Sequence, residues 1–302
     1  MTTKVGAHFM AQAIGHLAAW ASRKYPFEKG QWRLGSLAYR LLPADAVRSQ
    51  VRTVATRHGF ALQLDLGQFV DRTIYCTGGW EPLETKVISA ALKPGDSFVD
   101  VGANIGFFSL LAQRLVGAEG RVHAIEATPS TADLLDTNIA RNGASAIRVH
   151  RCAVGDREGT VHMVVHDSGN IGSNHLSFDG NANDVASAPV PLRRLDSLLG
   201  GEAIRLIKLD IEGAEAMALR GAGALLDGDK APALLFEFSP SMLRGMGDDP
   251  AALLPWLEAR GYAIHEIYPD RLTPPDAAIM TRVQTYLLAL KPGDPLYAAL
   301  NR

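Results

Sequence analysis

The 302-residue sequence has few of the features that mark several large protein classes. Its two cysteines, Cys76 and Cys152, have neither the CxxC spacing of a thiolate metal site nor the numbers of a disulfide framework, which favours a reducing compartment. No apolar run reaches the roughly 18 residues of a membrane span. Residues 5–21 weakly resemble a signal peptide, but polar side chains interrupt them and their apolar residues recur at helical spacing, which predicts an amphipathic helix. We therefore expect a soluble, cytoplasmic protein without a membrane span.

The sequence also lacks an excess of charge. It has 30 Lys and Arg against 32 Asp and Glu, a formal net charge of −2, which excludes a generally basic nucleic-acid binder. The distribution is uneven, because residues 1–80 carry ten Lys and Arg against four Asp and Glu. Such a basic segment is compatible with an anionic partner or a membrane surface, and equally with a solvated helical face.

The order of the predicted elements favours an α/β fold. Residues 1 to about 60 have the pattern of helices broken at Pro26 and Pro43, which predicts a helical N-terminal cap before a domain over residues 61–302. Five short apolar strands, alternating with helices, are predicted over 97–101, 121–127, 147–154, 204–210 and 233–238. Two more, over 262–268 and 283–290, have no crossover helix between them. The pattern predicts a mostly parallel sheet with helices on both faces and an antiparallel C-terminal edge.

One stretch departs from this alternation. Between the third and fourth predicted strands lie an alternating strand over 160–166 and a polar loop over 168–187. Loops of this length are commonly lids, binding loops or disordered segments. We interpret about 160–190 as a lid or substrate loop.

The most informative string is VDVGANIG over 99–106, between a predicted strand and a predicted helix. Gly102 allows the backbone to approach a ligand where a side chain would collide. Glu126 ends the next predicted strand, where an acid can accept hydrogen bonds from both hydroxyls of a ribose. Together these residues indicate a nucleoside-containing cofactor.

The glycine spacing argues against a dinucleotide. The dinucleotide fingerprint is GxGxxG, with a pyrophosphate at the helix N-terminus, whereas Asn104 stands where its second glycine would be. S-adenosylmethionine, which has a ribose and no phosphate, fits better. Two alternatives are a nicotinamide-dependent oxidoreductase and a catalytically silent module that keeps the fold for an interaction.

Four blocks of the sequence resemble the FkbM-type methyltransferases and stand in the same order: TGGWEPLET (77–85), VDVGANIGFFSLLA (99–112), KLDIEGAEAMALRGA (208–222) and LLFEFSP (234–240). The resemblance implies a seven-stranded Rossmann-like sheet, S-adenosylmethionine as methyl donor, and O-methylation of hydroxyls on small molecules, glycans, lipids or natural products. It implies such an acceptor as partner and no nucleic acid; a homo-oligomer stays open. Carried over position by position, it assigns the turn to Asp100, Gly102, Asn104 and Gly106, the ribose to Glu126, the adenine to Ala153 and the methionine end to Glu84.

An alcohol acceptor also needs a group that takes or weakens its proton. Asp210 and Glu237 end the fourth and fifth predicted strands, where the acceptor should bind. One of them could be a metal-free general base, or both could hold a Mg²⁺-like ion. Alternatively, Asp210 and Glu212 only cap the following helix, with Lys208 neutralising them. In the polar loop, His175 is the histidine best placed to reach a substrate as a base.

Overall fold

The computed structural model describes residues 2–25, 28–48, 50–164, 175–177, 187–227 and 230–301. The described residues form two compact units, Met1–Pro82 with Thr137–Gly143, and Leu83–Asp136 with Ala144–Val165 and Ser173–Arg302. Most of the predicted loop over 168–187 lies outside the described residues. Within the part of the chain that is described, no helix combines the length and apolar character that crossing a bilayer requires.

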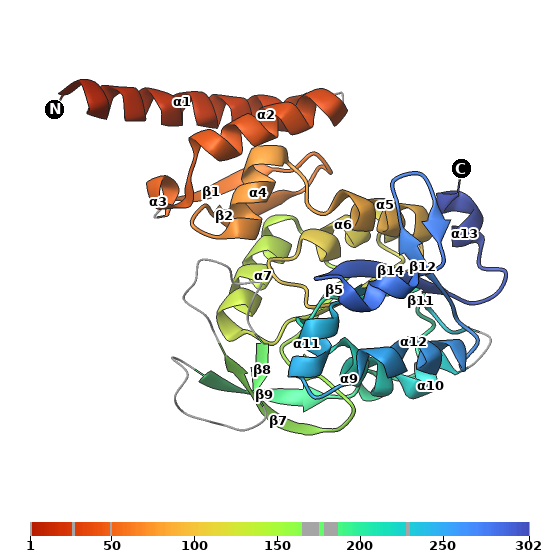
Figure 1. Ribbon diagram of the computed structural model, residues 1–302. Helices are drawn as coiled ribbons and strands as arrows, with labels where there is room; N and C mark the ends of the chain where they lie inside the picture. Colours follow the sequence, from red (N-terminus) through yellow and green to blue (C-terminus); the bar gives the residue numbers. More distant parts are fainter. Residues whose placement is uncertain are drawn as a thin grey trace. The chain divides into compact units, whose positions relative to one another are not determined.

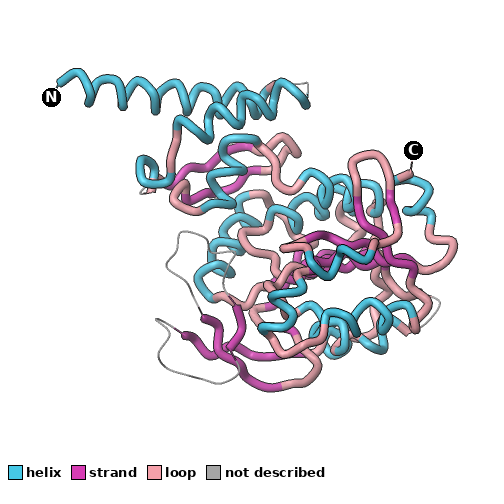
Figure 2. Tube along the Cα trace, viewed as in Figure 1, coloured by secondary structure: helices cyan, strands magenta, loops and turns pink. Residues whose placement is uncertain are grey.

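The first unit consists of helices and a small hairpin. Its elements are α1 (Thr2–Lys24), α2 (Glu28–Leu41), α3 (Ala44–Val47), β1 (Val51–Ala55), β2 (Ala61–Asp65) and α4 (Phe69–Thr77). α1 ends at Lys24 and α2 at Leu41, each two residues before a proline of the sequence, in agreement with the predicted helix boundaries. Figures 1 and 2 show α1 and α2 packed along one another. The antiparallel β1–β2 hairpin was not expected from the sequence.

The second unit contains an eight-stranded sheet. Its strands, in spatial order, are β13 (Leu272–Thr273), β12 (Ala263–Ile267), β14 (Thr285–Leu290), β11 (Ala233–Phe238), β10 (Leu206–Leu209), β3 (Ser97–Val101), β4 (Arg121–Ile125) and β5 (Ile147–His150). The five strands from β11 to β5 are parallel, and β14 lies antiparallel between β11 and β12. This confirms the predicted Rossmann-like sheet with an antiparallel C-terminal edge; β13 is a short addition at that edge. The chain order reverses between β3 and β10, which is where ligands bind in such sheets.

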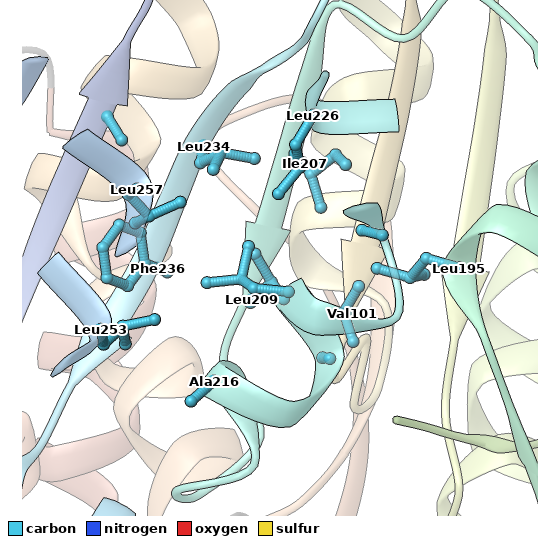
Figure 3. Close-up of a cluster of buried hydrophobic side chains, with 14 of the residues drawn as sticks. Val101, Leu195, Ile207, Leu209, Ala216, Leu226, Leu234, Phe236, Leu253 and Leu257 are labelled. Atoms are coloured by element: carbon cyan, nitrogen blue, oxygen red, sulfur yellow. The ribbon is translucent and has the colours of Figure 1, made fainter. Parts of the chain in front are cut away.

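Helices cover both faces of this sheet (Figure 1). They are α5 (Pro82–Ala91), α6 (Phe107–Val116), α7 (Pro129–Arg141), α8 (Leu195–Leu199), α9 (Glu215–Arg220), α10 (Gly223–Leu226), α11 (Pro240–Gly245), α12 (Pro250–Glu258) and α13 (Pro295–Leu300), with a 3₁₀ turn, η2 (Ala277–Thr281). Side chains from α8, α9, α10 and α12 share one hydrophobic core with the strands, shown in Figure 3.

Strand alternation sends polar side chains to the other face of the sheet. Val99 and Phe236 belong to this hydrophobic core, so Asp100 and Glu237, one residue further along each strand, face the opposite way. Lys208 pairs with Asp100 across β10 and β3 and shares that face. The sheet therefore has an apolar face and a face on which buried charges meet.

The third predicted strand, over 147–154, is divided between two sheets. β5 ends at His150, and β6 (Ala153–Val154) pairs instead with β9 (Ser187–Arg193) in a four-stranded sheet. β7 (Gly159–Val164) and β8 (His175–Ser177) complete that sheet. The predicted single strand was therefore wrong, because a continuous apolar pattern does not show where the chain changes partners.

Candidate active site

The turn after β3 is fastened to the end of β4. The backbone N–H groups of Gly102 and Ala103 donate to the carbonyl oxygen of Ile125, at 3.0 and 2.9 Å. Gly102, Asn104 and Gly106 have φ values of 78°, 50° and 92°, in the region that glycine adopts most readily. The predicted turn is thus present, with three of its residues in left-handed conformations.

Gly102 is required by a contact inside the protein. A Cβ atom at this position would lie 2.0 Å from the carbonyl oxygen of Asp210, at the end of the neighbouring strand β10. At Gly106, it would lie 2.6 Å from Cδ1 of Leu135. Packing inside the protein is therefore enough to require glycine at 102, and the predicted close approach to a ligand stays a prediction.

Glu126 follows β4, and its buried carboxylate is held by the backbone. Oε2 accepts the N–H of Asn104 at 3.0 Å, and Oε1 accepts the N–H of Thr128 at 2.8 Å. Burial raises the pKa of Glu126, while the hydrogen bonds from Thr128 and Asn104 lower it. The carboxylate is thereby fixed in place beside the turn.

Asp100 lies in β3, two residues before Gly102. It is fully buried, and its Oδ2 accepts a 2.6 Å hydrogen bond from the Ser109 hydroxyl of α6. Its Oδ1 has no hydrogen-bond partner among the described residues and lies 3.9 Å from Nζ of Lys208. Burial raises the pKa of Asp100, and Lys208 lowers it. The carboxylate therefore links β3 to α6, the two elements that the turn joins, and its assignment to cofactor binding stays a prediction.

Two further predicted site residues lie in the smaller sheet. Ala153 is buried in β6, in a cluster with Leu192 and Met217. Its contact with adenine stays a prediction. The backbone of His175 pairs with Val164, but its side chain lies outside the described residues, so its predicted role as a base stays a prediction as well.

Asp210 lies where β10 ends, with two donors on one of its oxygens. Nζ of Lys208 lies 3.2 Å from Oδ2, and the hydroxyl of Tyr286 donates to the same atom at 3.0 Å. Lys208 is itself buried, with Nζ 4.9 Å from the centre of the Phe108 ring. The Asp210 carboxylate is thus oriented from two strands, β10 and β14.

Asp210 contributes to the raised pKa values of neighbouring carboxyl groups. Burial raises the pKa of Glu237 to about 9, and repulsion from Asp210, Glu215 and Glu212 adds to the shift. Burial also raises the pKa values of Glu215 to about 8 and of Glu212 and Glu84 to about 7, with Asp210 contributing to each. The Glu237 carboxyl group therefore releases its proton much less readily than an exposed glutamate does.

Neither of the two donors to Asp210 was assigned a functional part from the sequence. Lys208 was considered only as a neutralising charge, although a lysine inside the apolar string IRLIKLD is a signal of a buried charge partner. Tyr286 gives no such signal in TYLLAL, because its position depends on β14 pairing with β11, opposite Glu237. Strand order in space brings these residues together.

The side chains around Asp210 provide few ligands for a metal ion. Among the described ranges, no three His, Cys, Asp or Glu side chains are arranged to hold one. Burial raises the pKa of Glu237, one of the predicted pair, and Oδ2 of Asp210, the other, is already paired with Lys208. The residues present therefore fit a metal-free site better than a Mg²⁺ site.

The sequence is similar to known methyltransferases. The family described as Methyltransferase FkbM domain matches residues 100–264, more than half of the chain. Methyltransferase 1 of Beauveria bassiana (strain ARSEF 2860) is 28% identical over 212 residues, which cover 63% of this chain and 82% of that protein. The 31-O-demethyl-FK506 methyltransferase FkbM of Streptomyces tacrolimicus is 31% identical over 159 residues, 43% of this chain and 60% of that protein.

Similarity to solved structures is more distant. The O-methyltransferase TomG from Streptomyces achromogenes, in complex with SAM, is 15% identical with a TM-score of 0.42; the match covers 71% of this chain and 82% of that one. The family match contains the turn, Glu126 and the blocks over 208–222 and 234–240, whereas the block over 77–85 lies outside it.

Proposed function

The chain belongs to the FkbM methyltransferase family, as its motifs predict, and from this premise we propose that it is an S-adenosylmethionine-dependent O-methyltransferase. The acceptor we propose is a hydroxyl of a small molecule, glycan or natural product. The observation that carries the proposal is the carboxylate of Glu126, held by two backbone N–H groups at the end of β4. Domain limits of 61–302 for the catalytic part are included in the proposal.

The residues present fit the nucleoside of this cofactor. A carboxylate has about four acceptor sites, of which Glu126 uses two for the N–H groups of Asn104 and Thr128. A third is shared with the Thr128 side chain, whose hydroxyl can rotate away. Glu126 can therefore accept hydrogen bonds from a ribose. When bound, S-adenosylmethionine supplies a methyl group on a positively charged sulfur.

Asp210 is the group we propose to take the proton of the acceptor hydroxyl. Lys208 and Tyr286 both contact its Oδ2, so Oδ1 is the atom left for the substrate. Burial and repulsion from Asp210 raise the pKa of Glu237, so we propose that Glu237 keeps its proton and donates a hydrogen bond to Asp210 in place of acting as the base itself. A positioned base of this kind contributes about 10²–10⁴-fold to a rate.

The two cysteines support the proposed compartment. Cys76 and Cys152 are both free and buried, and burial raises the pKa values of their thiols to about 12 and about 11. Such thiols are unreactive, and free cysteines are typical of proteins in a reducing environment. We propose a cytoplasmic enzyme on this basis.

Calorimetry with S-adenosylhomocysteine tests the cofactor assignment. The wild type should bind, and Glu126→Ala should lose at least about tenfold in affinity, because it removes the charged acceptor of the ribose hydroxyls. Glu119→Gln, an exposed acid in the loop after α6, is the matched control and should bind normally. Absence of binding to the wild type, or unchanged binding in Glu126→Ala, would contradict the assignment.

Transfer of a labelled methyl group to hydroxyl-bearing compounds tests the chemistry. Asp210→Asn should lose about 10²-fold or more in turnover and keep its affinity for S-adenosylhomocysteine, because it removes only the proton acceptor. A chelator should leave the rate unchanged. Binding of S-adenosylhomocysteine without transfer to any acceptor fraction would indicate a silent module, and binding of NADH instead would indicate an oxidoreductase.

A further inference from the structure

The outward face of α1 is apolar. Met10, Ile14, Leu17 and Trp20 recur at the spacing of one helix face and are 64%, 48%, 64% and 56% exposed. Four large apolar side chains in a row, exposed on one helix, are unusual for a surface that meets only water. We call these four residues the α1 stripe.

The opposite face of α1 consists of small buried residues, which explains why the helix cannot rotate to bury the stripe. Ala18, Ala19 and Ser22 are buried there, and Ser22 donates a 3.0 Å hydrogen bond to the carbonyl oxygen of Gln31 in α2. At Gly15, a Cβ atom would lie 2.8 Å from Cγ of Leu42. The helix therefore packs on its neighbour through small residues, and rotating it would force the large ones into space that is already filled.

The segment that carries the stripe is basic. The helix α1 contains no acidic residue, and exposed Lys24 follows Trp20 at the spacing that continues the stripe. Residues 1–48 contain seven Lys and Arg against two Asp and Glu. Arg33 and Arg40 of α2 are exposed, and neither forms a salt bridge within the described residues. The helix thus combines an apolar face with a positive field.

We propose that the α1 stripe docks on the surface of a bilayer that contains anionic phospholipids. The helix would lie in the plane of the interface with the stripe among the acyl chains and Lys24 among the phosphates, which is the arrangement that amphipathic basic helices adopt. Trp20 suits this position, because tryptophan favours the boundary between acyl chains and head groups. A second copy of the chain fits less well, since it would bring two basic segments together without compensating acids.

Flotation of the full chain with vesicles tests the proposal. The wild type should float with vesicles of phosphatidylcholine and phosphatidylglycerol, bind those of phosphatidylcholine alone much less, and lose binding as salt is raised. Leu17→Glu places a charge among the acyl chains and should weaken binding at least about tenfold. Lys24→Glu should also weaken it, by about fivefold or more, because it reverses the sign of one contact with the lipid.

The matched control is Val283→Glu, at an 84% exposed apolar residue of the second unit. It adds the same charge away from the stripe and should float like the wild type. The proposal is overturned if the wild type does not float with anionic vesicles, or if Leu17→Glu floats as well as Val283→Glu. It is also overturned if light scattering shows a dimer that only Leu17→Glu dissociates, because the stripe would then be an interface between copies.

Discussion

Replacing Glu237 with glutamine should make the protein's stability much less sensitive to pH. Glu237 is 1% exposed, and its Oε2 has no hydrogen-bond partner within the described residues. Burial and the neighbouring carboxylates raise its pKa from 4.5 to about 9. The folded state therefore holds a proton that the unfolded chain releases above about pH 4.5. The stability that this group contributes is fully present below pH 4.5 and is lost as the pH rises through 9.

The magnitude follows from proton linkage. One proton held in the folded state alone changes the free energy of unfolding by about 1.4 kcal/mol per pH unit. Between pH 6 and pH 8, the Glu237 carboxyl group should therefore lower the free energy of unfolding of the wild type by about 2.7 kcal/mol. Glutamine keeps the shape and has no proton to lose, so Glu237→Gln should lack this loss. Burial also raises the pKa of Glu215, to about 8, so Glu215 makes stability depend on pH in both proteins. The quantity to measure is therefore the difference in pH dependence between the wild type and Glu237→Gln.

The assay is urea unfolding followed by circular dichroism at pH 6 and at pH 8. The control is Glu258→Gln, which removes an exposed carboxyl at the end of α12 and should behave as the wild type does. The reasoning is refuted if Glu237→Gln loses as much stability between pH 6 and pH 8 as the wild type does. It is also refuted if the stability of Glu258→Gln is as insensitive to pH as that of Glu237→Gln.

Three other substitutions test the contacts around the site. Gly102→Ala should lower the free energy of unfolding by about 3 kcal/mol or more, since its Cβ would meet the carbonyl oxygen of Asp210 at 2.0 Å; a wild-type urea midpoint would contradict this. Lys208→Met should cost about 3–5 kcal/mol at neutral pH, because it leaves the carboxylates of Asp100 and Asp210 without their buried cation, and the same titration measures it. Tyr286→Phe removes a donor to Asp210 and should lower turnover by about tenfold while leaving calorimetric affinity for S-adenosylhomocysteine unchanged; equal turnover would remove Tyr286 from the mechanism.

Local patterns predicted the turn after β3 and the position of Glu126 beside it, while the part of these residues in cofactor binding stays a prediction. The turn and Glu126 lie at the ends of β3 and β4, two strands that are consecutive in the chain and adjacent in the sheet. A strand, a glycine-rich turn and an acid at the next strand end are each visible in a short stretch of sequence, so their neighbourhood follows from the usual order of parallel strands. The Rossmann-like sheet with its antiparallel edge was confirmed for the same reason.

The contacts around Asp210 could not be predicted in this way, because no short stretch of the sequence contains them. Lys208 acquires its role from Asp100, more than a hundred residues earlier, and Tyr286 from strand pairing beside Glu237. The contact that requires Gly102 is made by Asp210 of a non-consecutive strand. Hydrophobic periodicity gives the face of a residue and not its neighbour in space, which is why these partners were missed.

The insertion of β14 between β11 and β12 affects how the protein can be made. Its pairing partners leave the ribosome before it does, so the nascent sheet has a gap until residues 285–290 emerge and fill it. Until then, β11 exposes an unpaired edge and Asp210 has no phenol beside it. Chains that stop before Thr285 should therefore be prone to aggregate, and they should lack the hydrogen bond that the Tyr286 hydroxyl group donates to Asp210 at the proposed acceptor site.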